Sequence, residues 1–170
     1  MEIQYREEVF PSDVATVRAL TSATGFFSQD EISVAVELVE ERLTKGLRSG
    51  YHFIFAEHSG KVLGYTCFGP IPCTLSSFDI YWIAVLPAMQ SKGVGRDLLK
   101  RTEQKIKDLG GTRIYVETSA RAQYQPTLRF YQRQGYSQEA LLKDFYGPGD
   151  HKAVYLKVLA TKGTDPSSSS

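Results

Sequence analysis

The chain has 170 residues, which suits one domain with a single core, and its 42% content of hydrophobic residues excludes wholesale disorder. Its 20 basic and 19 acidic side chains give a net charge of +1, which argues against a nucleic-acid binder that depends on bulk positive charge. No apolar stretch is long enough to span a bilayer and no signal peptide is visible. We therefore expect a cytoplasmic protein without a membrane or nucleic-acid partner.

The first third of the sequence predicts one strand and two helices. Residues 3–7 are typical of an opening strand, and Pro-Ser-Asp at 11–13 provides the chemistry of a helix start. Residues 28–45 predict a second helix, because apolar side chains recur on one face and Gly46 can cap its end. Phe26 lies on the connection between these helices, where an aromatic side chain either packs into the core or lines a substrate site.

Three strands are expected next. Residues 51–56 and 62–68 have strand character and are joined by a hairpin signal. Residues 78–86 form an almost continuous apolar run, which indicates a central strand that is buried on both faces. Pro87 ends this strand because proline cannot donate a hydrogen bond to a neighbouring strand.

The last part of the sequence predicts two helices and three strands. Residues 93–109 predict an amphipathic helix and residues 112–118 the strand after it, so this strand and the central one are expected to be parallel. Residues 127–134 predict a short helix, with a proline before it and a glycine just after it. Residues 136–145 and 153–158 are expected to close the fold as an antiparallel pair.

One domain accounts for most of the sequence. Residues 1–160 are expected to form a single α/β unit, and the Ser-rich tail at residues 161–170 is expected to be disordered because it cannot bury apolar surface. Cys67 and Cys73 are interpreted as reduced thiols. The three histidines are scattered and form no cluster with the cysteines at metal-ligand spacing, so no metal site is predicted.

A glycine-rich turn follows the central strand and opens the long helix. Backbone N–H groups at a helix start have no partner within the helix, and the helix dipole adds positive charge, so this turn suits a phosphate or pyrophosphate. Lys92 and Arg96 add positive side chains. A plain strand-to-helix turn without a ligand explains the glycines equally well. A dinucleotide-binding fingerprint also competes, although Leu98 stands where that motif needs its third glycine.

Two motifs give the chain a family resemblance. Gln-x-x-Gly-x-Gly at 90–95 follows a strand that ends in Ala-Val-x-Pro, and Phe-Tyr-Gln-Arg-Gln-Gly-Tyr occupies 130–136. Together with the order of elements from 3 to 158, this resembles the GCN5-related N-acetyltransferase (GNAT) superfamily. The resemblance implies an α/β fold with a mixed central sheet of about six to seven strands, about four flanking helices, and a splay between the fourth and fifth strands.

The resemblance also implies an activity and a co-substrate. GNAT enzymes transfer an acetyl group from acetyl-CoA to a primary amine by direct attack in a ternary complex. The backbone of Val85 would pair with the pantetheine arm, and Tyr131 would protonate the departing thiolate. The remaining cofactor contacts implied by the motif are Gln90, Ser91, Lys92, Gly93, Val94, Gly95 and Arg96.

Two carboxylates are candidates for the base, since an amine attacks only when neutral and free amines have pKa values of about 8 to 10. Asp79 aligns with the glutamate of the histone-acetylating members. Glu117 resembles the glutamate of the members that acetylate ribosomal-protein N-termini. Either side chain can instead be an ordinary charge at the end of a strand, and a water molecule can relay the proton to either.

The acceptor is left open by the sequence. Tyr124 stands where many family members carry asparagine, and Tyr146 and Asp150 lie on the hairpin that borders the acceptor site in this family, so with Phe26 they are the expected substrate contacts. The acceptor can be a small molecule or a peptide, and an acyl group longer than acetyl stays open. A non-catalytic acyl-CoA-binding module is the main alternative function. Homodimers are common in the family, so we expect that this protein can also form a homodimer.

Overall fold

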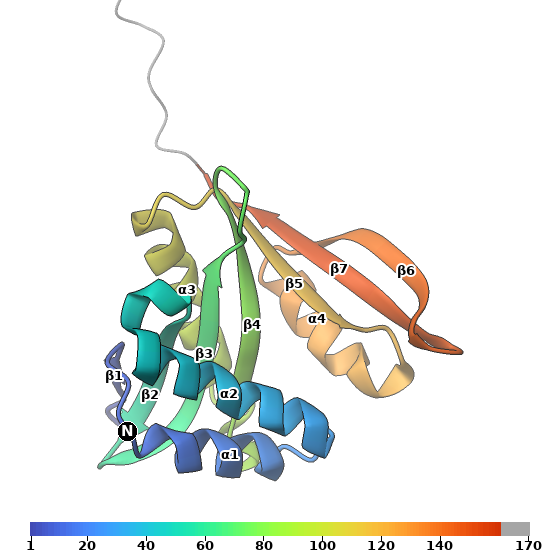
Figure 1. The fold of residues 1–170 in the computed structure, drawn as a ribbon. Coiled ribbons are helices and arrows are strands. Elements are labelled where there is room, and N and C mark those ends of the chain that lie inside the picture. Colours follow the sequence, from blue (N-terminus) through green and yellow to red (C-terminus); the bar gives the residue numbers. More distant parts are fainter. Residues whose placement is uncertain (161–170) are drawn as a thin grey trace, which may run out of the picture.

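The computed structural model describes residues 1–160, and the predicted Ser-rich tail at 161–170 lies outside the described residues. Within residues 1–160, seven strands form one sheet in the order β1-β2-β3-β4-β5-β7-β6 (Figure 1). Every neighbouring pair is antiparallel except β4 and β5, which are parallel, as the sequence predicts. The expected mixed α/β sheet is therefore confirmed.

The first five elements lie close to their predicted positions. They are β1 (Gln4–Arg6), α1 (Asp13–Ala23), α2 (Gln29–Lys45), β2 (His52–His58) and β3 (Lys61–Pro70). Helix α2 begins at a capping box, in which the Ser28 side chain accepts from the backbone of Glu31 and the Glu31 side chain accepts from the backbone of Ser28. It ends where Gly46 takes a positive φ of 62°. Local capping chemistry therefore sets both ends of this helix.

The second half of the chain follows the predicted order as well. Its elements are β4 (Ser77–Val85), α3 (Val94–Asp108), β5 (Arg113–Ser119), α4 (Gln125–Arg133), β6 (Ser137–Gly147) and β7 (Asp150–Val158). The closing hairpin of β6 and β7 is longer than predicted and extends away from the rest of the sheet (Figure 1).

Helices cover both faces of the sheet and create two cores (Figure 1). Helices α1 and α2 lie over β2, β3 and part of β4, where Val39, Phe55 and Tyr65 are buried together. Helices α3 and α4 lie on the opposite face, where Leu98 and Ile114 are completely buried. The apolar faces of the predicted helices are therefore the ones that contact the sheet.

Strand β4 corrects one expectation. It is central, as predicted, but it is not buried on both faces along its whole length. Phe78 and Ile80 are buried in the core beneath α3, whereas Asp79 is half-buried and Tyr81 is 36% exposed on the opposite face. Helices α1 and α2 leave that part of the sheet uncovered. The apolar run is typical of a doubly buried strand because its one exposed position, Tyr81, carries an aromatic side chain.

The two central strands separate along most of their length. Residues of β4 and β5 pair only at Ser77–Arg113, Phe78–Ile114 and Asp79–Tyr115. Beyond Asp79 the strands diverge, as Figure 1 shows. Tyr81 has no partner in β3, because the pairing steps from Ile80 to Trp82 across a bulge, and bulges increase the local twist of a strand. The expected splay between the fourth and fifth strands is therefore confirmed.

Three further features of residues 1–160 bear on function. None of their helices combines the length and the apolar character needed to cross a membrane. No group of three or more His, Cys, Asp and Glu side chains in that range is arranged to hold a metal ion. Both cysteines are free: Cys73 is exposed, whereas burial raises the pKa of the Cys67 thiol well above its usual range.

Candidate active site

The turn between β4 and α3 directs several backbone N–H groups outward. Ser91 and Gly93 have φ values of +63° and +84°, so the chain reverses sharply there. The first hydrogen bond of α3 runs from the Asp97 N–H to the Gly93 carbonyl, at 3.0 Å. The N–H groups of residues 94–96 precede that bond and are free for a ligand. Such a turn at a helix N-terminus suits an anion.

Side chains fix this turn against its neighbours. The Gln90 side-chain amide donates to the Val85 carbonyl at 3.3 Å, which ties the turn to the end of β4. A Cβ atom added to Gly95 would lie 3.6 Å from Val85 Cγ2 and 3.7 Å from Phe130 Cζ. One added to Gly93 would lie 3.6 Å from the Arg96 guanidinium. The turn, the end of β4 and helix α4 therefore meet at one place.

The backbone of Val85 faces the opening between the strands. The Leu86 N–H donates to the Leu63 carbonyl of β3 at 2.8 Å. Because the backbone groups of successive strand residues point to opposite edges, the N–H of Val85 points away from β3. Strand β5 has already diverged at this level and does not pair with Val85. The end of β4 therefore offers a backbone donor to a ligand in the splay.

Tyr131 lies on the other side of this opening, on α4. Its side chain is only 3% exposed and belongs to the same buried cluster as Val85 and Val94. The rings of Phe130 and Tyr136 lie 5.3 Å and 5.4 Å from it, each tilted toward an edge-on contact. Burial raises the pKa of Tyr131 well above its usual range, so its hydroxyl keeps its proton and can act as a donor.

The two predicted base candidates lie on the uncovered face of the sheet, on opposite sides of the splay. Burial, followed by the negative charge of Glu117, raises the pKa of Asp79 from 3.8 to about 6, while Lys152 opposes that shift. Glu117 is differently placed, because its carboxylate forms an ion pair with Lys152 at 2.7 Å. Asp79 forms no ion pair within the described part of the chain.

The predicted substrate contacts lie on three segments, which are the connection between α1 and α2, the segment before α4, and the closing hairpin. Phe26 and Tyr124 approach to 6.3 Å between ring centroids, so the connection between α1 and α2 reaches the segment that precedes α4. Tyr146 on the closing hairpin is influenced by Glu117, Asp150 and Tyr124, and its pKa is raised, first by burial and then by these groups. The structure therefore brings Phe26 to Tyr124, and brings Tyr146 near Glu117 and Asp150.

Four polar or aromatic side chains near this site were not predicted. Lys152 neutralises Glu117, the Ser119 hydroxyl donates to Asp150, and Arg121 forms an ion pair with Asp150 at 3.3 Å. Tyr81 lies beside Asp79, and burial, followed by the Asp79 charge, raises the pKa of Tyr81 to about 12. None of these four side chains carried a signal in the sequence, because Lys152 precedes the strand expected at residues 153–158.

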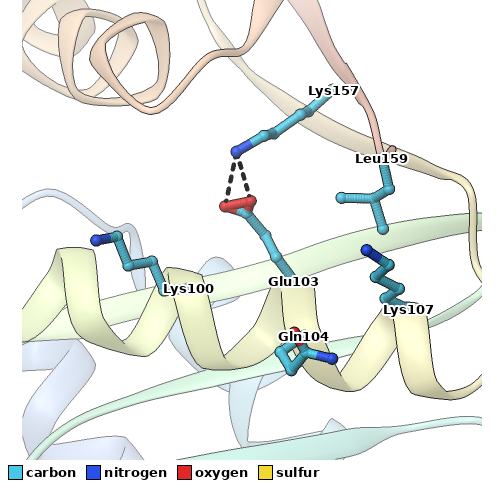
Figure 2. A pocket seen from close by; sticks show the side chains of 6 residues that line it. All are labelled: Lys100, Glu103, Gln104, Lys107, Lys157 and Leu159. Atoms are coloured by element: carbon cyan, nitrogen blue, oxygen red, sulfur yellow. Dashed lines mark hydrogen bonds and ion pairs between the residues drawn. The ribbon is translucent and has the colours of Figure 1, made fainter. Parts of the chain in front are cut away.

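Two cavities of about 210 Å³ lie away from the predicted site. In the first, the Lys157 ammonium binds the Glu103 carboxylate at 2.7 Å, next to the exposed side of α3 (Figure 2). The side chains that line it are Lys100, Glu103, Gln104, Lys107, Lys157 and Leu159. The residues that line the second cavity include Arg42, His52 and Lys105. Neither cavity contains a predicted site residue.

Comparison with protein families gives one match. Residues 18–136 match the model of the acetyltransferase (GNAT) family. None of the curated proteins matches the chain. The matched segment includes β4, the turn, α3, β5 and α4, and so covers both sides of the splay.

Solved structures of similar proteins agree with this match. One is a crystal structure of a protein from Desulfovibrio desulfuricans that is assigned to the GNAT family. Its sequence is 44% identical to this chain, the TM-score is 0.92, and the aligned region covers 94% of this chain and 100% of the other. The ribosomal-protein-S18-alanine N-acetyltransferase of Escherichia coli is 15% identical, with a TM-score of 0.74 and coverage of 96% and 98%. The YncA structure of Salmonella typhimurium, which contains acetyl-CoA, is 18% identical, with a TM-score of 0.73 and coverage of 98% and 99%.

Proposed function

The chain belongs to the GNAT family of acetyltransferases, and we propose that it transfers an acetyl group from acetyl-CoA to a primary amine that binds beside Asp79. Transfer occurs by direct attack while both substrates are bound, so no residue of the protein is acetylated on the way. The arrangement that carries this proposal is the splay between β4 and β5, with the turn after β4 and Tyr131 at one face of the sheet and Asp79 at the other face.

The residues around the turn fit acetyl-CoA. The free N–H groups of residues 94–96 suit its pyrophosphate, and Lys92 and Arg96 add positive charge beside them. The open edge of β4 at Val85 matches the amide groups of the pantetheine arm, which can pair with it as a strand would. The co-substrate supplies an activated thioester, and the protein has to position it and manage protons.

Proton removal from the amine falls to Asp79 in this proposal. An alkylamine arrives as an ammonium ion at neutral pH, and it has to lose one proton before its nitrogen can attack. Asp79 is ionised above its pKa of about 6 and forms no ion pair in the described part of the chain, so it can accept that proton. Glu117 is held by Lys152 and is better suited to orient the ammonium group than to take its proton.

Two further groups of the chain act during the transfer. Negative charge develops on the thioester oxygen as the amine attacks, and a backbone N–H near Val85 on the open edge of β4 can donate a hydrogen bond to it. As the new C–N bond forms and the C–S bond breaks, the nitrogen loses its second proton to water, and the sulfur gains one from Tyr131, which water reprotonates. Tyr131, which stays protonated because it is buried, donates toward that sulfur.

A matched pair of variants tests the proposal. Tyr131→Phe should lower kcat about a hundredfold or more in an assay of CoA release with a panel of amines, and should leave acetyl-CoA binding unchanged. Tyr136→Phe is the control, because the Tyr136 side chain is equally buried and its hydroxyl has no hydrogen-bond partner among residues 1–160. Wild-type binding of acetyl-CoA without any amine-dependent CoA release would favour the non-catalytic binding module. The expected homodimer is tested separately by the mass of the protein in solution.

A further inference from the structure

The second cavity lies beside an open strand edge and contains no residue of β4 or β5. Strand β1 stops at Arg6, opposite Phe55, so within residues 1–160 no strand pairs with the outer edge of β2 at His52 and Phe53. Both of these residues line the cavity, whose volume is about 210 Å³. A space of this size takes one small ring with a substituent, since a water molecule occupies about 30 Å³ in the liquid.

Aromatic side chains form the wall of this cavity. Phe53 and Phe68 are buried, one in each of the two cores, so the cavity reaches around the open edge of β2. The ring of His52 stacks on that of Phe68, with 5.5 Å between the centroids and 20° between the planes. Two exposed leucines, Leu47 and Leu109, lie at its rim. The wall therefore suits a flat apolar group.

Positive charge exceeds negative charge around the same cavity. The ammonium of Lys105 is paired with the carboxylate of Glu7 at 2.9 Å. Arg42 is half-buried, and its Nη1 donates to the Tyr51 carbonyl at 2.8 Å. Its guanidinium forms no ion pair among residues 1–160, and its other N–H groups remain free. A guanidinium with free N–H groups matches a planar carboxylate, which can accept two parallel hydrogen bonds from it.

We propose that this cavity binds a small aromatic carboxylate, whose ring lies against Phe68 and His52 and whose carboxylate pairs with Arg42. Lys105 is a second cation for the ligand, and Glu7 competes with the ligand for it. A neutral ligand leaves Arg42 uncompensated, and an inorganic anion leaves the aromatic wall in contact with water. The site is separate from the turn after β4 and from Asp79, so it does not depend on the proposed function.

Calorimetry with three probes tests the ligand class. The probes are benzoate, its neutral isostere benzamide, and inorganic phosphate. We expect saturable binding of benzoate to the wild type with a Kd of about 1 mM or lower, at least tenfold tighter than that of benzamide or phosphate. Absence of benzoate binding to the folded protein overturns the proposal, as does equal or tighter binding of either other probe.

Two variants of opposite effect locate the ligand. Arg42→Gln should weaken benzoate binding at least tenfold. Because Arg42 also holds the Tyr51 carbonyl, a loss alone can reflect damage to the fold. Glu7→Gln frees Lys105 from its ion pair and should strengthen benzoate binding at least threefold, which a damaged fold cannot produce. The control is Arg48→Gln, at an exposed arginine outside the cavity, and it should change nothing. Unchanged affinity in Arg42→Gln or in Glu7→Gln overturns the proposal.

The ring of His52 provides a readout inside the cavity. Burial, followed by the charges of Arg42 and Lys105, lowers the pKa of His52, whereas Glu7 opposes that shift. A bound carboxylate adds negative charge beside this ring and should raise the pKa of His52 in an NMR titration with saturating benzoate. The other histidines, His58 and His151, lie outside the cavity and should titrate as before. A pKa of His52 that does not respond to benzoate overturns the proposal.

Discussion

Replacing Asp79 by asparagine tests whether this carboxylate takes the proton from the incoming ammonium group. Burial and the charge of Glu117 raise the pKa of Asp79 from 3.8 to about 6. The wild-type kcat/KM should therefore fall about tenfold per pH unit well below pH 6 and reach half of its plateau at about pH 6. It should then stay level until the free amine itself loses its proton, at about pH 10 for an alkylamine.

The asparagine variant should follow a different profile. It cannot accept a proton, so it can use only the small fraction of acceptor that is already neutral in solution. That fraction rises about tenfold for each pH unit below the pKa of the amine. The kcat/KM of Asp79→Asn should therefore increase about a hundredfold between pH 7 and pH 9, whereas the wild-type value changes less than about twofold.

The assay is the initial rate of CoA release, quantified by chromatography from pH 5 to pH 9.5 at constant ionic strength. Glu117→Gln is the matched control, because it removes the neighbouring carboxylate that Lys152 already neutralises. That variant should keep the level profile between pH 7 and pH 9. Parallel profiles for the wild type and Asp79→Asn would refute the reasoning, and a steep profile confined to Glu117→Gln would transfer the role of base to Glu117.

Three predictions concern stability. Arg6→Ala leaves the carboxylate of Asp13, which is 1% exposed, without its bidentate partner, and should lower the free energy of unfolding by about 3 kcal/mol in urea titrations. Lys45→Ala, which breaks an exposed pair, should cost much less, and equal losses would contradict this account of Arg6. Gly111→Ala should lower Tm, because the added Cβ atom would lie 2.8 Å from the ring of Phe78 in β4. An unchanged Tm would show that the surrounding side chains move aside without cost. Asp79→Asn should raise Tm more at pH 8 than at pH 4. The pKa of Asp79 is higher in the folded than in the unfolded protein, so the stability of the wild type falls as the pH rises from about 4 to 6. Equal changes of Tm at the two pH values would contradict the raised pKa.

Local signals were sufficient to predict the elements. The ends of α2 follow from Ser28, Glu31 and Gly46, each of which acts within one helical turn of the chain. The order of strands and helices follows from the period of the apolar residues, and it holds throughout residues 1–158. The family motifs then added the splay, which no local pattern in the sequence encodes.

The uncovered face of β4 could not be predicted from its composition. A tyrosine at position 81 is compatible with a buried core or with the wall of a site, and only the packing of α1 and α2 decides between these. The bulge at Tyr81 depends on pairing with β3, which lies at a distance in the sequence. For the same reason the expectation of burial on both faces was wrong on the side where the acceptor is proposed to bind.

The electrostatic difference between the two base candidates also depended on tertiary structure. Asp79 and Glu117 are equivalent as residue types near strand ends. Strand β7 pairs with β5 and brings Lys152 into an ion pair with Glu117, whereas Asp79 feels the charge of Lys152 only at longer range and forms no ion pair within residues 1–160. Lys152 lies some thirty-five residues beyond Glu117 in the sequence. Which of the two carboxylates it pairs with cannot be predicted until the register of β5 and β7 is known.

Binding of acetyl-CoA at the turn after β4 is the central claim, and calorimetry of wild-type and Gly93→Glu protein tests it most directly. Gly93→Glu places bulk and negative charge where the pyrophosphate is expected. Gly60→Glu is the control. Gly60 also has a positive φ, of 75°, and no atom lies close to the position of an added Cβ, but it is in the turn between β2 and β3 and not in the turn after β4. The account predicts saturable binding by the wild type and by Gly60→Glu, and its loss in Gly93→Glu. Equal binding by all three proteins, or none by the folded wild type, would contradict it.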